Sequence, residues 1–210
     1  MKTEIIIEAI KQLNVYGWEI TDTCEEGWEF YLIRGRLDQN RAKDVEHIRV
    51  KLYVKSEDGQ FLGSASAEIP PTADETETAR LLRNLRLSAS CVRNPIYQLV
   101  QPAEIGTVGD CPAPDTMARD FLEALRDLPQ TETEDLNSAE IFVSRKTRRL
   151  VTSEGIDVTF TYPESMVEAV LNARRKDQEI ELYRMLRSGA CDAAGLTREL
   201  SEAMRIDRKS

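Results

Sequence analysis

The sequence is poor in the side chains on which most hydrolytic sites depend. It contains one histidine, His47, in 210 residues. Zinc peptidases place two histidines one helical turn apart with a carboxylate, and a Ser-His-Asp or Cys-His site would also have to use His47. No nucleophile elbow lies near His47 in the sequence. A Cys-His pair formed by folding, with a cysteine distant in sequence, stays open. We therefore expect a surface histidine, and neither a catalytic residue nor a metal ligand in this chain.

Export and membrane signals are also missing. The start, Met1-Lys2-Thr3-Glu4, leads into only three consecutive isoleucines, which is too short and too charged for a signal peptide. No run of about 18 apolar residues occurs, so no transmembrane helix is expected. The four cysteines, at positions 24, 91, 111 and 191, include no Cys-x-x-Cys pair. These features predict a cytoplasmic chain with no membrane partner and with reduced, structurally passive thiols.

A phosphate-binding loop and an excess of positive charge are absent too. Gly106-Thr107-Val108-Gly109 lacks a following Lys-Ser or Lys-Thr pair. The net charge is −9, which disfavours nucleic acid as the main partner. Basic residues cluster at 34–43 and 145–149. One interpretation is a nucleic-acid surface, and the other is solvated strand ends with acidic neighbours. The overall charge favours the second interpretation.

Hydrophobic periodicity is the strongest positive signal. Residues 45–54 alternate, with Ile48, Val50 and Leu52 on one face, as in a half-buried strand. Residues 28–38 are apolar on both sides, which predicts a strand in the centre of its sheet. Further strands are expected at 61–69, 139–147, 156–162, 165–175 and 178–187, with turns that include Glu26-Gly27, Glu57-Asp58-Gly59-Gln60 and Tyr162-Pro163.

Helical spacing predicts four helices. They are expected over 3–14, after a capping box of Thr72 and Glu75, around 121–128, and after a cap at Asp192. Strands and helices are segregated, and turns join most successive strands. This pattern predicts the α+β class, with antiparallel or mixed β-sheets and helices packed on one face, in two sequential α/β units. The units are expected at 1–100 and 116–210, with a proline- and glycine-rich linker at 101–115.

Six segments along nearly the whole chain carry a family resemblance. They are Phe30–Arg34, Leu37–His47, Phe61–Thr72, Arg93–Tyr97, Ser153–Val158 and Glu179–Arg184. In this order they resemble the TldD/PmbA family, whose older name is modulator of DNA gyrase. Its known members resemble zinc metallopeptidases that act on unfolded peptides as two-subunit assemblies. Their His-Glu-x-x-x-His motif belongs to a C-terminal domain and is not found in this sequence.

The resemblance implies the non-catalytic N-terminal region of such a peptidase, shaping a peptide channel or a subunit interface. The implied partners are a C-terminal metallopeptidase domain, a second TldD/PmbA-type subunit and unfolded peptides, and zinc is expected only in the C-terminal domain. We expect a truncated form of a longer protein, although a naturally short relative stays open. The candidate interaction residues are Arg34, Arg36, Asp38, Arg41, His47 and Asn94.

Two other functions stay open. One is a stand-alone protein-binding or regulatory module without peptidase activity. The other, suggested mainly by the older family name, is a regulator that contacts DNA or gyrase. The reading frame downstream of codon 210 distinguishes the peptidase region from the stand-alone module, because only the peptidase hypothesis expects the His-Glu-x-x-x-His pattern there.

Overall fold

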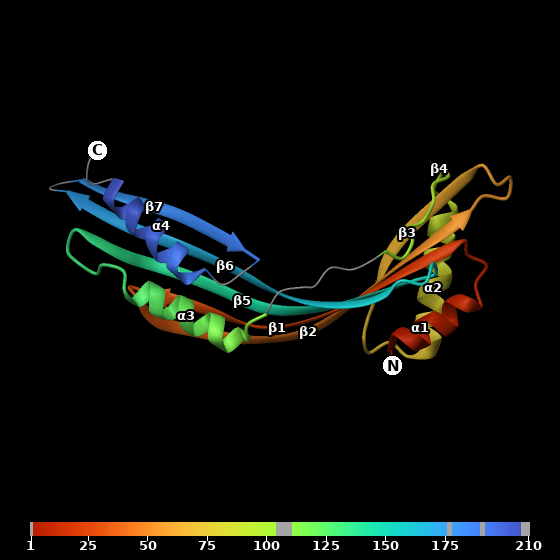
Figure 1. Ribbon diagram of the computed structural model, residues 1–210, viewed down its shortest axis with the longest axis horizontal. Helices are drawn as coiled ribbons and strands as arrows, with labels where there is room; N and C mark the ends of the chain where they lie inside the picture. Colours follow the sequence, from red (N-terminus) through yellow and green to blue (C-terminus); the bar gives the residue numbers. More distant parts are fainter. Residues whose placement is uncertain (1, 104–110, 176–177, 190–191, 207–210) are drawn as a thin grey trace. The chain divides into compact units, whose positions relative to one another are not determined.

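The structure is a computed structural model that describes residues 2–103, 111–175, 178–189 and 192–206. Its strands form one 7-stranded sheet in the order β4-β3-β2-β1-β5-β6-β7 (Figure 1). The strands are β1 (Gly17–Ile33), β2 (Arg36–Lys55), β3 (Phe61–Ile69), β4 (Asn94–Pro95), β5 (Glu134–Thr152), β6 (Asp157–Arg175) and β7 (Gln178–Ser188). The helices are α1 (Lys2–Lys11), α2 (Glu75–Ser90), α3 (Pro114–Arg126) and α4 (Ala193–Ile206). The antiparallel sheet and the segregated helices confirm the α+β class. None of the described helices is long and apolar enough to cross a membrane.

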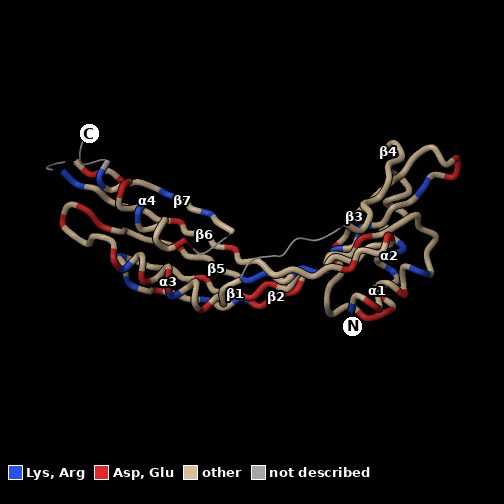
Figure 2. Tube along the Cα trace, in the orientation of Figure 1, with Lys and Arg blue, Asp and Glu red and all other residues tan. Residues whose placement is uncertain are grey.

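The chain forms two compact units, each assembled from separate stretches of sequence. Unit 1 comprises Met1–Cys24, Val45–Thr107 and Thr147–Phe160, and unit 2 comprises Glu25–Asp44, Val108–Lys146 and Thr161–Ser210. Each unit therefore takes residues from both sides of the linker expected at 101–115, of which residues 104–110 lie outside the described ranges. Strands β1, β2, β5 and β6 contribute residues to both units. Acidic and basic residues are interspersed along each unit (Figure 2).

In unit 1, α1 and α2 pack on β1, β2 and β3. The core consists of Ile6, Ile10, Ile20, Ile48, Val50, Leu52, Ile69, Ala73, Leu82 and Leu85. Small residues along 61–69 allow a helix to approach closely. A Cβ atom at Gly63 would lie 2.0 Å from the carbonyl oxygen of Ala89 near the end of α2. The alternation expected for 45–54 is confirmed at Ile48, Val50 and Leu52, which are buried. Tyr53, which the same alternation places on the solvated face, is 2% exposed and packs with Leu62 and Leu99, so the prediction was wrong at that position.

The start of α2 differs from the expected capping box. Asp74 is the N-cap, and its carboxylate accepts a hydrogen bond from the backbone N–H of Glu77 at 2.8 Å. Thr72 lies before the helix, in a turn closed by the hydrogen bond from the Ala73 N–H to the Pro70 carbonyl at 3.0 Å. The prediction that Thr72 caps α2 was therefore wrong, because the turn after Pro70 places Asp74 at the helix start.

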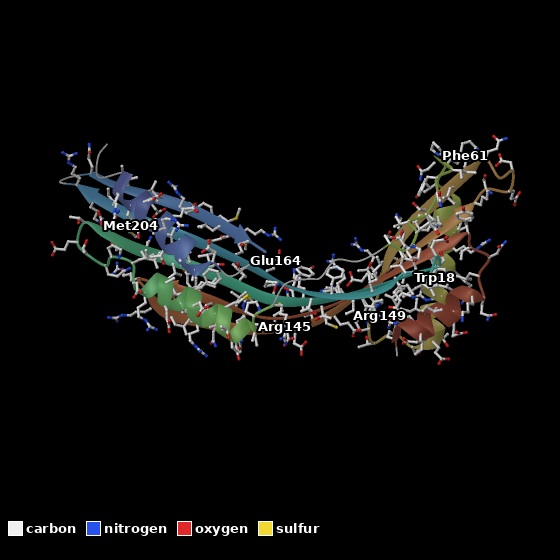
Figure 3. All side chains as sticks on the ribbon, in the orientation of Figure 1. Trp18, Phe61, Arg145, Arg149, Glu164 and Met204 are labelled. Atoms are coloured by element: carbon white, nitrogen blue, oxygen red, sulfur yellow. The ribbon has the colours of Figure 1, made fainter. Side chains whose placement is uncertain are left out.

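In unit 2, α3 and α4 contact each other and cover one face of the sheet (Figure 1). Their buried residues include Met117, Phe121, Leu125, Leu196, Leu200, Ala203 and Met204, which pack on Leu32, Leu136, Ile141, Val143, Val167, Ala169 and Leu171. Met204, labelled in Figure 3, is 1% exposed. The expected cap of α4 is confirmed, because the Asp192 carboxylate accepts a hydrogen bond from the Gly195 N–H at 2.8 Å.

The strand predicted at 28–38 is in fact a hairpin. β1 ends at Ile33, and the turn uses Arg34 and Gly35, whose φ angles are 49° and 69°. β1 lies between β2 and β5, which confirms a central position. The turn predicted at Glu26-Gly27 was wrong, because both residues lie within β1. Gly27 is required by close approach, since a Cβ atom there would lie 2.3 Å from the carbonyl oxygen of Val143 on β5.

The turn predicted at Tyr162-Pro163 was also wrong. The stretches 156–162 and 165–175 fall largely within one strand, β6. Proline is tolerated in a strand where a neighbouring strand is missing. The pairing of β6 with β7 ends at Ser165 and Ser188, so Pro163 lies beyond the end of β7.

Candidate functional site

Within the part of the chain that the structure describes, helices cover one face of the unit 2 sheet, and we call the other face the open face. Because side chains alternate along a strand, the neighbours of the core residues on β1, β5, β6 and β7 point to it. The register of β6 with β7 places Val170 opposite Tyr183 and Glu168 opposite Met185 on this face. Tyr183 and Met185 are 55% and 56% exposed. The apolar residues of the open face are Tyr31, Phe142, Met166, Val170, Tyr183 and Met185.

Alternating charges cross this face from strand to strand, and we call them the long charge row. Its members, in strand order, are Lys43 on β2, Glu25 on β1, Lys146 on β5, Glu164 on β6 and Arg187 on β7. The Lys43 ammonium lies 3.1 Å from Glu25, and Lys146 lies 3.7 Å from the same carboxylate. Lys146 also bonds Glu164, which accepts from Nε of Arg187 at 3.1 Å. Figure 3 labels Glu164 within this part of the sheet.

A second set of ion pairs, the short charge row, lies nearer the other end of β7. It runs from Asp135 on β5 through Arg174 on β6 to Glu179 on β7. Nε of Arg174 donates to Glu179 at 2.9 Å, and the Asn172 amide donates to Asp135 at 3.0 Å. The long row therefore reaches β7 with a cation and the short row with an anion.

Partial burial and pairing set the protonation of the long row. The hydrogen bonds from Arg187 and then from Lys146 hold the pKa of Glu164 below its ordinary value of 4.5. Burial opposes the charged form of Lys146, but the Glu164 hydrogen bond and the Glu25 charge raise its pKa above the ordinary value. Both groups stay charged at neutral pH. Each group is therefore held in its charged form by its partner.

Two shallow hollows lie beside the row. One of about 210 Å³ is lined by Phe142, Met166 and members of the long row, and one of about 250 Å³ by Tyr31, Phe142, Gln39, Arg41 and Glu140. Both combine aromatic or thioether surface with charged groups. This arrangement fits contact with a polypeptide, since interfaces combine apolar contact areas with paired polar groups.

The candidate residues predicted from the sequence fall in two places. Arg34 lies in the β1–β2 turn, and Arg36 and Asp38 lie on exposed β2 positions of unit 2. Arg41, also on β2, forms an ion pair with Glu29 at 2.7 Å and lines the larger hollow. These four residues therefore gather at one end of β2 and the adjacent turn.

The other two candidates belong to unit 1. His47 is exposed on β2, and its Nδ1 lies 2.6 Å from a carboxylate oxygen of Glu68. Asn94 is half-buried on β4, opposite Leu62. The structure therefore does not bring all six candidates to one site, and their role in binding stays a prediction.

Sequence reasoning missed the charge rows. Arg145, Lys146 and Arg149 were assigned to solvated strand ends with acidic neighbours. Arg145 is paired with Glu26 at 2.5 Å, and Arg149 with Asp157 at 2.9 Å (Figure 3). The acidic neighbours are therefore present, but the assignment to solvated strand ends was wrong, because residues 145–149 lie inside β5 and the Lys146 side chain is only 20% exposed. The individual charges were visible in the sequence, but the register between β1 and β5 that joins them was not.

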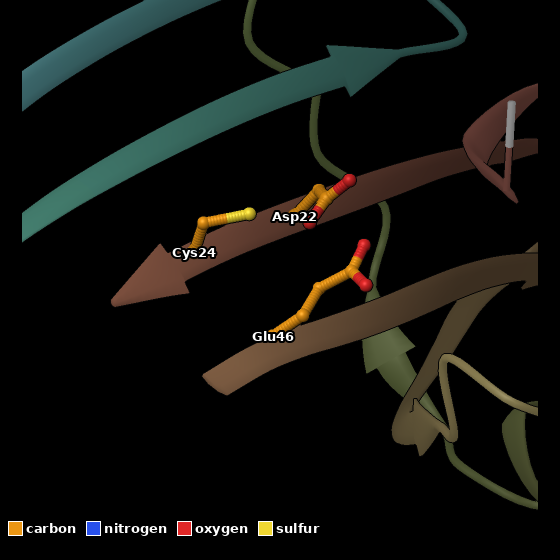
Figure 4. A group of neighbouring side chains, drawn as sticks. All are labelled: Asp22, Cys24 and Glu46. Carbon is orange, nitrogen blue, oxygen red and sulfur yellow. The ribbon is translucent and has the colours of Figure 1, made fainter. Parts of the chain in front are cut away.

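A group of possible metal ligands lies in unit 1, at Asp22, Cys24 and Glu46 (Figure 4). One ligand atom from each lies within 4.8 Å of the others. Oδ1 of Asp22 is buried without a hydrogen-bond partner, whereas Oδ2 accepts from the Thr3 hydroxyl at 3.4 Å. Cys24 and Glu46 are exposed. Zinc sites need about three or four ligands in tetrahedral geometry, and this group supplies three from the described residues.

Comparison with known proteins identifies the fold. No protein-family model and no curated protein matches the sequence. Among solved structures, TldE from Thermococcus kodakarensis matches 98% of this chain with a TM-score of 0.68 and 12% identity. A candidate modulator of DNA gyrase from Thermotoga maritima matches 97% with a TM-score of 0.64 and 12% identity, and one from Bacteroides thetaiotaomicron matches 97% with 0.65 and 12%. The matches cover 47%, 47% and 48% of those chains, so this chain has the fold of about half of a TldE-type protein.

Proposed function

We propose that this chain is the non-catalytic N-terminal region of a TldD/PmbA-like peptidase, and that its open face lines a channel for unfolded peptides or contacts a second subunit. The observation that carries the proposal is the apolar surface of the open face, which no helix of the described residues covers, whereas α3 and α4 pack on the opposite face. Tyr183 and Met185 are more than half exposed there. A surface of this kind typically marks a binding site.

The chemistry of the open face supports binding without catalysis. Its carboxylate Glu164 is held by Arg187 and Lys146, which lower its pKa, so it carries no proton to donate at neutral pH. Unfolded peptides expose apolar side chains that the hollows beside Phe142 and Met166 can accept. Zinc chemistry, on this proposal, belongs to a further domain that carries the histidine motif.

Binding of a fluorescently labelled, unstructured peptide rich in Leu and Phe tests the proposal. We expect saturable binding, measured by fluorescence anisotropy, without cleavage of the peptide. Phe142→Ser and Met166→Ser remove part of the apolar contact and should weaken affinity roughly ten-fold, since burying such a side chain contributes about 1.5–3 kcal/mol.

Leu87→Ser is the matched control. Leu87 is 64% exposed on α2 in unit 1, so its loss should leave peptide affinity unchanged. No binding by the unaltered chain, or equal weakening by Leu87→Ser, would contradict the open face as the peptide site.

The alternative function, a stand-alone protein-binding module, has one observation in its favour. Each unit contains its own hydrophobic core of buried residues, so the chain can fold without further domains. A stop after codon 210, with no TldD-like gene beside it, would favour this alternative. A continuing frame with the His-Glu-x-x-x-His pattern would favour the peptidase.

A further inference from the structure

β7 ends the sheet of unit 2 with an unpaired edge. In the described part of the chain, β6 lies on one side of β7 and no strand lies on the other. The strand is 11 residues long and exposes Ile180, Tyr183 and Met185. The strand also carries Glu179, Glu181, Arg184 and Arg187, and a charged edge of this kind pairs with another strand only where the opposing charges are complementary.

Backbone groups of β7 are turned toward this edge. The guanidinium of Arg184 donates to the carbonyl oxygen of Tyr183 at 2.9 Å. On β6 the Arg174 N–H donates to the Thr133 carbonyl on the β5 side, so alternate residues of β6, including Val170, turn their backbone groups away from β7. Tyr183 is the partner of Val170 in the β6–β7 register, so the Tyr183 carbonyl points outward, where Arg184 reaches it. In antiparallel sheets every second residue presents both its N–H and its C=O on the same side. The N–H of Tyr183 then points outward as well.

We infer that the outer edge of β7 pairs with the same edge of a second copy of this chain, in an antiparallel register centred on Tyr183. The two copies are related by a two-fold axis midway between their Tyr183 residues. Their sheets then join into one, and each face of the sheet continues across the pair. Residues directly opposite each other in a sheet share a face. Tyr183 then lies opposite its own copy, and the outward N–H and C=O groups of the two tyrosines bond each other.

The charge rows select this register. Glu179, the end of the short row, and Arg187, the end of the long row, lie on either side of Tyr183 at equal distance along β7. With Tyr183 at the centre, Glu179 of one copy lies opposite Arg187 of the other, twice per pair of chains. The short row of one copy then continues into the long row of the other with strictly alternating charge. On the helix-covered face, Ile180 lies opposite Leu186.

Neighbouring registers are less favourable. A centre at Arg184 places two guanidinium groups directly opposite each other, and like charges in this position are destabilising. A centre at Leu182 places Glu179 opposite Met185, so the ends of the two charge rows no longer face each other. Pairing through one strand buries less area than the about 1,600 Å² of a standard interface. We therefore expect a weak, micromolar dimer.

Sedimentation velocity over a range of concentrations, combined with charge reversal, tests the inference. Glu179→Arg and Arg187→Glu alone should each weaken the dimer roughly ten-fold, because each turns two attractive pairs into repulsive ones. The double variant restores opposite charges across the edge and should recover the dimer. A thermal melt of each variant checks that the monomer remains folded.

Cross-linking tests the register itself, in a background with the four native cysteines replaced by serine. Tyr183→Cys should be linked efficiently by a short bis-maleimide, because position 183 faces its own copy. Gln178→Cys faces position 188 and lies roughly 34 Å from its own copy at 3.4 Å per residue, so it should not be linked. A monomer at all concentrations, or a dimer that links through position 178 and not 183, overturns the inference. Neither outcome bears on the peptide assay of Phe142 and Met166.

Discussion

At the scale of single residues, Gly27 shows how a neighbouring strand determines the choice of residue. The carbonyl oxygen of Val143 would lie 2.3 Å from a Cβ atom at this position. Backbone cannot move aside as a flexible side chain can. The glycine therefore permits the close approach of β1 and β5 in unit 2.

Gly27→Ala is expected to lower the free energy of unfolding by roughly 1–3 kcal/mol, the usual cost of overpacking. Gly189→Ala is the control, because a Cβ atom there meets nothing within 4 Å. Urea denaturation of both variants measures the difference. Equal stability of the two variants would contradict a close approach of β5 to Gly27.

The convergence of Cys24 with two carboxylates allows the expected absence of zinc to be tested. Asp22, Cys24 and Glu46 converge in unit 1, whereas His47 is engaged by Glu68. Two of the three converging residues are exposed, and Asp22 already accepts a hydrogen bond from Thr3. We expect less than stoichiometric zinc in protein purified without chelator or affinity tag, measured by elemental analysis. About one zinc per chain, lost in Cys24→Ser and retained in Cys91→Ser, would overturn this expectation.

At the scale of secondary-structure elements, the start of α2 offers a direct comparison of two caps. Asp74→Ala removes the acceptor for the Glu77 N–H and should destabilise the protein by about 1 kcal/mol. Thr72→Ala, at the position that the sequence pattern favoured, should be nearly neutral. Thermal melts of the two variants decide between the caps, and a larger loss from Thr72→Ala would restore the capping box.

The long charge row makes stability depend on pH. The pKa of Glu164 in the folded chain is below 4.5, so its contribution is present above that pH and is lost as pH falls through the folded value. Glu164→Gln should lower the free energy of unfolding by roughly 1–3 kcal/mol at pH 7, since Lys146 loses a partner. The difference from the unaltered chain should shrink below pH 4.5.

Denaturant unfolding at a series of pH values measures this effect. Glu123→Gln, at an exposed position of α3, serves as the control and should not change the shape of the pH profile. A constant difference between Glu164→Gln and the unaltered chain down to acidic pH would show that the ion pairs contribute nothing.

Elements whose pattern is local were predictable from the sequence, and those set by distant partners were not. The alternation of Ile48, Val50 and Leu52 and the stripe of Leu196 and Leu200 arise within one element, and both are confirmed. Glycine and proline usually mark turns. Gly27 is instead required by the close approach of β5, and Pro163 is tolerated because it lies beyond the end of β7. The charge rows depend on the same non-local register, so no local pattern could reveal them.

At the scale of the whole molecule, the resemblance to the TldD/PmbA family is confirmed in the fold. The solved structures match 97% to 98% of this chain at 12% identity. At that identity few side chains correspond. The likeness therefore establishes the backbone arrangement, and the residues that bind a partner have to be identified by experiment. The two units of this chain nevertheless share four strands, which has a consequence for unfolding.

We expect both units to unfold together. β1 carries Trp18 in unit 1 and Trp28 in unit 2, so loss of one unit would remove pairing from strands that the other needs. In Trp18→Phe and in Trp28→Phe, the remaining tryptophan reports on one unit by fluorescence. Each variant's fluorescence transition in urea should coincide with its own circular dichroism transition. A clear separation in either variant would show that the units unfold independently.

The place of β1 between β2 and β5 also has a consequence for synthesis on the ribosome. The ion pair of Glu26 with Arg145 joins residues 119 positions apart. At about 5–20 residues per second, β5 emerges roughly 6–24 s after β1. Throughout that interval the nascent β1–β2 hairpin has one unsatisfied edge. Of the three acids on that part of β1, Glu25 and Glu29 have their partners, Lys43 and Arg41, within the hairpin itself, whereas Glu26 gains Arg145 only when β5 arrives.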